Sequence, residues 1–217
     1  MKKTEKIQFY ISFALKILLG LLTVASLLRG DYFTVFASSL VLLISFLPAI
    51  ISHSLKVRLP HEIDLTLTVI LYLHYVLGEY EGFYNKVAWW DLFLHSGNSV
   101  ILGLVGFVFA YVLLMTSRIS AKPFFISLFS LSLSVFIGVM WEVFEFVMDQ
   151  AFGFNMQKSG LVDTMTDLMA DVLGAFSISV LGFFYIKRPW PGLLHKAVMG
   201  AVRFWRKGKQ ALGKEEE

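Results

Sequence analysis

The hydrophobic positions of this chain form long uninterrupted runs rather than the short periodic patterns of soluble helices and strands. A helix needs about 20 apolar residues to cross the hydrocarbon core of a bilayer. The pattern therefore predicts an all-α, polytopic helix bundle with about six transmembrane helices. The predicted spans are residues 7–28, 32–52, 63–78, 91–115, 123–147 and 161–186.

Two residues inside the predicted spans need a physical account. Pro48 predicts a kink near the end of the second span, because proline removes a helix hydrogen bond. Lys16 falls inside the first span, so either its ammonium snorkels to the interface or the first turns lie among the headgroups. Segments 79–90 and 149–160 are predicted to be loops, the former with interfacial aromatic residues.

Composition agrees with this pattern. The chain is 57% hydrophobic and 16% charged, whereas soluble domains carry about 25% charged residues, and its mean hydropathy is +0.69. Because there is no cysteine, disulfides and thiolate ligands are excluded. A net charge of +3 is too small to indicate a nucleic-acid partner, and we expect membrane lipid instead.

The chain is predicted to divide into a transmembrane domain, residues 1–188, and a basic amphipathic tail, residues 189–217. In the tail, apolar residues recur at near-helical spacing from Leu193 to Trp205, and basic residues fill the other positions. This pattern predicts a helix that lies on an anionic leaflet. The alternative is a frayed, solvated terminus.

Basic residues are distributed unequally between the two predicted sides of the membrane. With six spans both termini share a side, which holds the basic residues of the N-terminus, of the second and fourth connections, and of the tail. The other side holds only Arg29, Lys86 and Lys158. The positive-inside rule therefore predicts a multi-pass plasma-membrane protein with both termini in the cytoplasm.

The acidic residues show the opposite bias, since ten of sixteen fall in the outer loops or the outer halves of the spans. On each of the last three spans, polar residues recur at the spacing of one helix face. The fourth span carries Asp91, His95 and Asn98, the fifth carries Glu142 and Glu145, and the sixth carries Asp163, Asp167 and Asp171.

These carboxylates indicate a divalent-metal site. A charged side chain near the middle of a transmembrane helix costs on the order of 2.5–3.5 kcal/mol, and clustered carboxylates also repel one another. Either some of these acids are protonated or cations neutralise them. A bound Mg²⁺, Mn²⁺, Fe²⁺ or Zn²⁺ is the simplest remedy, and the residue types do not choose among these metals. The candidate ligands are Asp91, His95, Glu142, Glu145, Asp163, Asp167 and Asp171.

Each candidate also has a purely structural interpretation. Asp91 and Asp163 could be helix N-caps, His95 a hydrogen-bonded core histidine, and Asp149 a surface residue. The remaining intramembrane acids could form a structural polar network, although acids at such depth are by default functional. Five glycines are expected at helix–helix contacts: Gly97, Gly103, Gly106, Gly138 and Gly174.

The same residues resemble a known family. The blocks Trp90-Asp91 with His95, Trp141 to Phe146, Asn155 to Gly160, and Asp163 to Ala175 resemble a bacterial and archaeal family of multi-pass membrane proteins of unknown function. They are also distantly similar to VanZ-like membrane proteins. The resemblance covers residues 89–175. Its VanZ component implies a role at the cell envelope or on a lipid, by analogy only.

Three functions are compatible with these features. The first is a metal-dependent enzyme acting on a lipid or cell-envelope substrate, with Glu142, Glu145 or His95 as general base. In that enzyme Asn98, Gln157 and Lys158 would contact the ligand. The second is an ion- or proton-coupled transporter, and the third is a non-catalytic protein that binds lipid or envelope material. The sequence does not indicate an oligomeric state.

Overall fold

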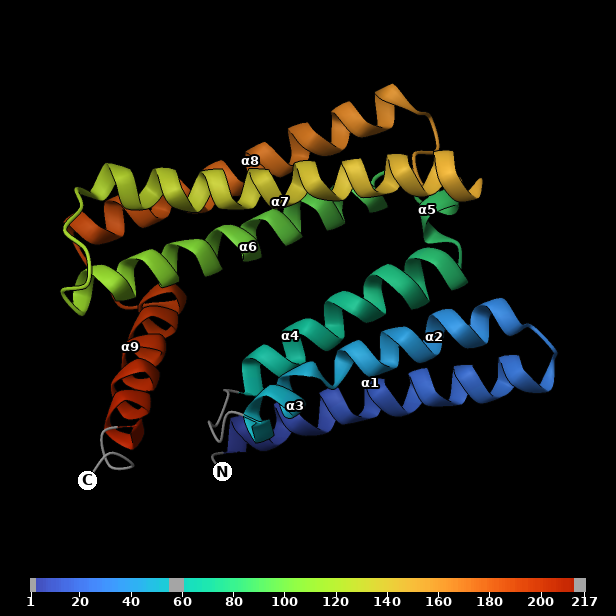
Figure 1. Ribbon diagram of the computed structural model, residues 1–217, viewed down its shortest axis with the longest axis horizontal. Helices are drawn as coiled ribbons and strands as arrows, with labels where there is room; N and C mark the ends of the chain where they lie inside the picture. Colours follow the sequence, from blue (N-terminus) through green and yellow to red (C-terminus); the bar gives the residue numbers. More distant parts are fainter. Residues whose placement is uncertain (1–2, 55–60, 213–217) are drawn as a thin grey trace. The chain divides into compact units, whose positions relative to one another are not determined.

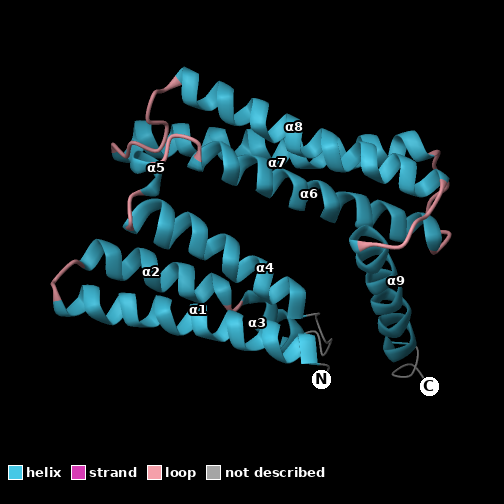
Figure 2. Cartoon of the chain, turned by 180° about the vertical axis from the view of Figure 1, so that it is seen from behind, coloured by secondary structure: helices cyan, strands magenta, loops and turns pink. Residues whose placement is uncertain are grey.

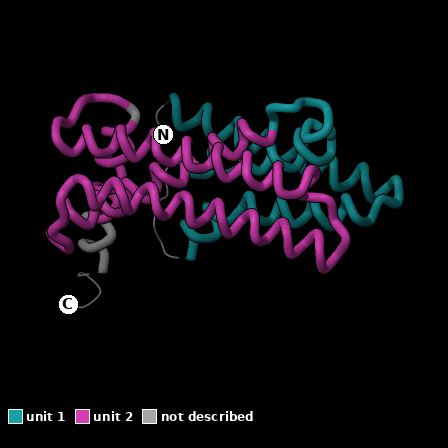
Figure 3. Tube along the Cα trace, turned by 90° about the horizontal axis from the view of Figure 1, so that it is seen from above, with its two compact units in different colours: residues 1–90 teal, residues 91–217 magenta. Residues whose placement is uncertain are grey.

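The computed structural model describes residues 3–54 and 61–212, and every regular element in these ranges is a helix (Figure 2). The all-α fold is therefore confirmed. The chain separates into two compact units, residues 1–90 and 91–217, which are described here one at a time (Figure 3). The boundary predicted at residue 188 stays a prediction. The basic residues of the second connection, Lys56 and Arg58, support the predicted orientation and lie outside the described residues.

The first unit contains α1 (Lys3–Leu28), α2 (Tyr32–Ser45), α3 (Leu47–Ser54), α4 (His61–Leu71), the π-helix η1 (Tyr72–Tyr80) and the short α5 (Phe83–Lys86) (Figure 1). The second contains α6 (Trp90–Met115), α7 (Pro123–Phe152), α8 (Leu161–Lys187) and α9 (Leu193–Leu212). Figures 1 and 2 show α6, α7 and α8 lying side by side along their length.

Four of these helices are long and apolar enough to cross a membrane, namely α1, α6, α7 and α8. A fifth span results if α2 and α3 are taken together, although they are bent by 41°. The bend falls at Phe46, with Pro48 in the first turn of α3, where a missing N–H costs no helix hydrogen bond. The chain is thus a multi-pass membrane protein with four to five candidate spans.

The predicted third span corresponds to α4 and η1, which follow each other directly and are each too short to pass as a span alone. The helix continues to Tyr80, so the first residues of the predicted 79–90 loop are helical, and α5 lies within the rest. The π-helix carries His74, whose Nδ1 lies 2.7 Å from the hydroxyl of Tyr84. Gly78 provides the space for the Tyr84 ring, because a Cβ there would overlap it.

Lys16 has an ion-pair partner within the first unit, which the sequence did not indicate. Its ammonium is buried, at 7% exposure, and forms an ion pair with Asp64 Oδ1 of α4 at 2.6 Å. The second oxygen of Asp64 accepts a hydrogen bond from Ser12 at 2.5 Å, and Ser12 also contacts Thr68 at 3.1 Å. Every charged atom of this pair therefore has a partner, which removes the need to reach the interface.

Small residues allow α6, α7 and α8 to approach closely. A Cβ on Gly103, Gly106 or Gly174 would meet atoms of a neighbouring helix, as expected, whereas one on Gly97 would meet nothing within 4 Å. Buried serine hydroxyls donate to main-chain carbonyls across the same interfaces. They join Ser130 to Gly103, Ser134 to Ser99 and Ser179 to Ser127, at 2.6, 2.8 and 2.6 Å. Such contacts are typical of helix packing in membranes.

Helix α9 is present, as the amphipathic pattern predicts, but part of its apolar face packs on its own unit. Val198 and Val202 are buried in a cluster with Phe107, Ile126 and Tyr185, and the Tyr185 hydroxyl lies 2.8 Å from Nδ1 of His195. Lys196 and Arg203 remain exposed. Contact of α9 with a leaflet stays a prediction.

The Lys16–Asp64 pair predicts a specific pattern of stability. Lys16→Met or Asp64→Leu alone leaves one buried charge unpaired, at a cost of about 3–5 kcal/mol. The double variant removes both charges and should lose less than the sum of the single losses. Thermal unfolding in detergent tests this, with the exposed Lys6→Met on α1 as the control. Additive losses would contradict the pairing.

Candidate metal centre

One face of α6 brings three polar side chains into unit 2. Asp91, His95 and Ser99 are spaced four residues apart, so they lie one above the other on the helix. His95 and Ser99 are buried, whereas Asp91 at the helix start is partly exposed. Ser99 was not among the predicted site residues, although its spacing from His95 could have identified it.

Asp171 of α8 is the best-anchored carboxylate of the site. Its Oδ1 accepts a hydrogen bond from the Ser99 hydroxyl at 2.6 Å and lies 3.3 Å from His95 Nδ1. The α7 residue opposite is Gly138, where a Cβ would overlap the Asp171 carboxylate. Asp171 is only 2% exposed, and the glycine is what allows it to lie against the α7 backbone.

The other ring nitrogen of His95 faces a group of acids. His95 Nε2 lies 3.7 Å from Asp91 Oδ1 and 3.8 Å from Glu142 Oε1. One ligand atom each from Asp91, His95 and Asp167 lie within 4.8 Å of one another. Ligand atoms lie about 2.0–2.2 Å from a small metal ion such as Zn²⁺. The three side chains are therefore close enough to converge on a single ion once their ligand atoms move closer together.

Glu142 of α7 is buried without the partners that a carboxylate needs. It is 4% exposed, and neither carboxylate oxygen has a hydrogen-bond partner among the described residues. Its Oε1 lies 3.8 Å from His95 Nε2. A buried carboxylate without hydrogen-bond partners is strongly unfavourable, and this one lies beside the group that could hold a metal ion.

The loop between α7 and α8 closes over the same end of the bundle. Lys158 Nζ lies 2.8 Å from Asp91 Oδ2, and the amide of Gln157 donates to Thr164 Oγ1 at 2.6 Å. Asp149 accepts hydrogen bonds from the main-chain N–H groups of Met156 and Gln157. Asp149 was expected in a loop, but α7 extends to Phe152, so this residue sits in the last helical turns and holds the loop from there.

The remaining predicted site residues lie outside the three-ligand group of Asp91, His95 and Asp167. Glu145 accepts a hydrogen bond from the Trp141 indole of its own helix at 2.8 Å, and Asn98 is half-buried on α6. Asp163 lies one turn before Asp167 and is outside the three-ligand group. The N-cap interpretation fails for Asp163, because Gly160 holds that position, and Asp91 lies inside the first turn of α6.

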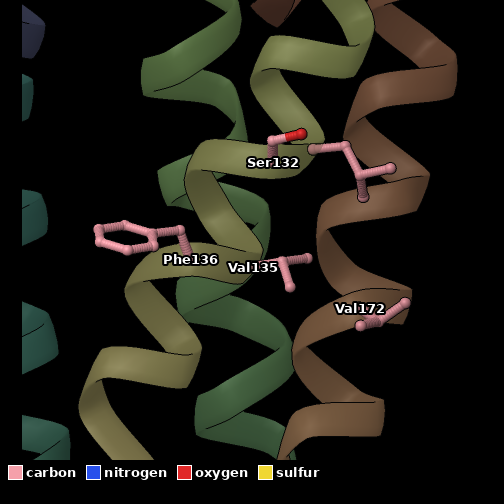
Figure 4. Close-up of a pocket in the computed structure, with 5 residues that line it drawn as sticks. Ser132, Val135, Phe136 and Val172 are labelled. Carbon is pink, nitrogen blue, oxygen red and sulfur yellow. The ribbon is translucent and has the colours of Figure 1, made fainter.

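A separate open groove of about 490 Å³ lies between α7 and α8 (Figure 4). Its lining residues are Leu131, Ser132, Val135, Phe136 and Val172. None of them is titratable, so this groove is not part of the carboxylate cluster.

Comparisons with known proteins place the chain among membrane proteins. Residues 10–188 match the model of a family described as "Predicted membrane protein (DUF2238)". The chain belongs to this family. A relative from Thermotoga maritima, described as an uncharacterized protein, is 32% identical over 163 residues, which cover 75% of this chain and 83% of the relative. No solved structure matches. All site residues lie within the family match.

Gly138 provides a test of this geometry. Gly138→Ala should displace the Asp171 carboxylate and lower both the thermal midpoint and any metal affinity, because the new Cβ overlaps Asp171. Gly97→Ala is the matched control, since open space surrounds that position and alanine is favoured in helices by up to about 1 kcal/mol. Equal behaviour of the two variants in thermal unfolding and metal titration would contradict the assigned packing.

Proposed function

We propose that this protein binds a divalent metal at the extracytoplasmic end of α6, α7 and α8 and is a metal-dependent enzyme acting on a lipid or cell-envelope substrate. The observation that carries the proposal is the three-ligand group of Asp91, His95 and Asp167. Beside it lies the buried Glu142, whose carboxylate oxygens accept no hydrogen bond from the described residues. In a purely structural polar network, the side chains provide hydrogen-bond partners for one another's oxygens. In a cation site, some acceptor oxygens are instead left for the cation to bind.

The surrounding residues suit distinct roles. A metal-bound histidine usually gives its second nitrogen to a carboxylate, which fixes the ring. Asp171 is suited to that role, because its contact with Nδ1 leaves Nε2 for the ion. The metal would polarise the substrate. Glu142 is the preferred general base, and Glu145 and Asp163 remain candidates for supporting roles.

The acid cluster does not continue along the bundle, which favours an enzyme over a transporter. Beyond Asp171, the described parts of α6 to α8 carry no acidic or basic side chain until the opposite end of the bundle. Serine-to-backbone hydrogen bonds and the core around Phe107 and Ile126 occupy the interior there. An ion pathway would need polar groups along its length. The lipid or envelope substrate class rests on the VanZ resemblance.

The orientation is part of the proposal. We propose six spans, with α2 and α3 as the second and α4 with η1 as the third, and both termini in the cytoplasm. The two segments α4 and η1 together contain 20 residues, since they cover 61–80, which is about the length that a bilayer requires.

Metal content is the direct test of the site. The purified wild-type protein should hold about one divalent ion per chain, and a chelator should lower its thermal midpoint, because bound ligand stabilises the folded state. Asp167→Asn with Asp171→Asn should abolish both effects, whereas the control Glu81→Gln, an exposed acid of the other unit, should not. A metal-free wild type whose midpoint ignores the chelator would disprove the metal site.

Cysteine labelling tests the orientation. The chain has no native cysteine, so Gly82→Cys introduces a single thiol in the connection between η1 and α5. An impermeant maleimide should label it in intact cells, and Ser117→Cys should react only after permeabilisation. The reverse pattern would place the site on the cytoplasmic side.

A further inference from the structure

Hydrogen bonds hold the α7–α8 connection on both sides of one lysine at the edge of the acid cluster. Two main-chain N–H groups, of Met156 and Gln157, donate to the two oxygens of Asp149 at 2.7 and 2.9 Å. The N–H of Gly160 donates to the Gln157 carbonyl at 2.7 Å. Lys158 lies between these fixed points, so its main chain is defined on both sides.

Asp91 is shared between the lysine and the proposed metal. Its Oδ1 faces His95 Nε2 at 3.7 Å, and its Oδ2 accepts from Lys158 Nζ at 2.8 Å. A metal ion on the three-ligand group and the ammonium would therefore flank one carboxylate. His95 and Asp167 are buried, whereas the Lys158 side chain is 26% exposed, so Lys158 lies at the more exposed edge of the cluster.

We propose that Lys158 and the metal together bind the phosphate of a phosphate monoester. The proposal rests on the metal site of the proposed function. A monoester carries up to two negative charges and three terminal oxygens, so one phosphate can contact two cations at once. An ammonium provides three N–H donors, which lets it hold Asp91 and a phosphate oxygen together, and lysine is a common point-charge ligand of phosphate.

The surroundings of the loop favour a phosphate at the membrane surface. Large apolar side chains are exposed on both sides of Lys158, namely Phe152 and Phe154 before it and Leu161 and Val162 after it. Such residues suit the boundary between headgroups and acyl chains. The phosphate could belong to a lipid headgroup or to a soluble monoester, and the experiment distinguishes the two sources.

The test uses the full chain in phosphatidylcholine nanodiscs, with Mn²⁺ and methyl phosphate as the probes. Calorimetry first measures Mn²⁺ binding, then methyl phosphate binding with and without saturating Mn²⁺. The wild type should bind methyl phosphate at least about tenfold more tightly with Mn²⁺ present, equivalent to about 1.4 kcal/mol. Repeating the titration with phosphatidic acid in the disc should weaken methyl phosphate binding if the natural source is a lipid. An unchanged titration indicates a soluble monoester.

Lys158→Gln separates the two proposals. It should weaken methyl phosphate binding about tenfold or more, yet bind Mn²⁺ as tightly as the wild type or more tightly, because it removes a cation that competes for Asp91. Lys158→Arg should restore part of the loss, and Lys86→Gln, a lysine of the other unit, should behave as the wild type. If Lys158→Gln does not fold, Asp149→Asn provides the second variant, since it weakens the loop attachment without touching the cluster.

The outcomes are distinguishable. Mn²⁺ binding without any methyl phosphate binding, or with equal binding in Lys158→Gln, overturns the phosphate site and leaves the metal site intact. Absence of Mn²⁺ binding in the wild type overturns both.

Discussion

Burial of carboxylates inside an apolar helix bundle is the constraint on which the second unit depends. Asp167, Asp171 and Glu142 are almost completely buried, in segments that are otherwise hydrophobic enough to span a membrane. Charges in such a medium must be paired or neutralised. Ser99 and His95 satisfy Asp171, and Lys158 satisfies one oxygen of Asp91. What remains unsatisfied, above all Glu142, is what makes the site a candidate for a metal.

The first unit shows how a structural polar pair differs from this site. The Lys16 ammonium pairs with one oxygen of Asp64, and Ser12 donates a hydrogen bond to the other oxygen. No further ion is therefore needed there. Among the described residues of the second unit, the acids Asp91, Glu142 and Asp171 pair with one histidine and one lysine, and Asp167 belongs to the same cluster. The contrast within one chain supports a functional interpretation of the second cluster, because a stable fold alone does not require unpartnered acceptors.

The geometry of the site depends on residues that carry no chemistry of their own. Gly138 gives Asp171 its place against α7, and Gly174 lets α8 approach the α6 backbone at Ser96. Asp149 fixes the loop that carries Lys158, because it accepts hydrogen bonds from two main-chain N–H groups of that loop. Preorganised ligands of this kind reduce the cost of assembling a metal or anion site. The geometry of the candidate site therefore depends on close helix packing as much as on the acids.

The sequence alone determined the helical class, the positions of the long apolar spans and the set of acids from which the candidate site is drawn, because hydrophobic length and helical spacing are local properties of the chain. Pro48 also predicted the bend near the end of the second span, which the structure places at Phe46. The sequence did not determine the π-helix at Tyr72–Tyr80 or the helical position of Asp149, which depend on packing and on continuation of local hydrogen bonds. Nor could it pair Lys16 with Asp64, 48 residues away, or select Asp91, His95 and Asp167 from seven candidate ligands. Those choices follow from which helix faces meet, and only the tertiary structure decides that.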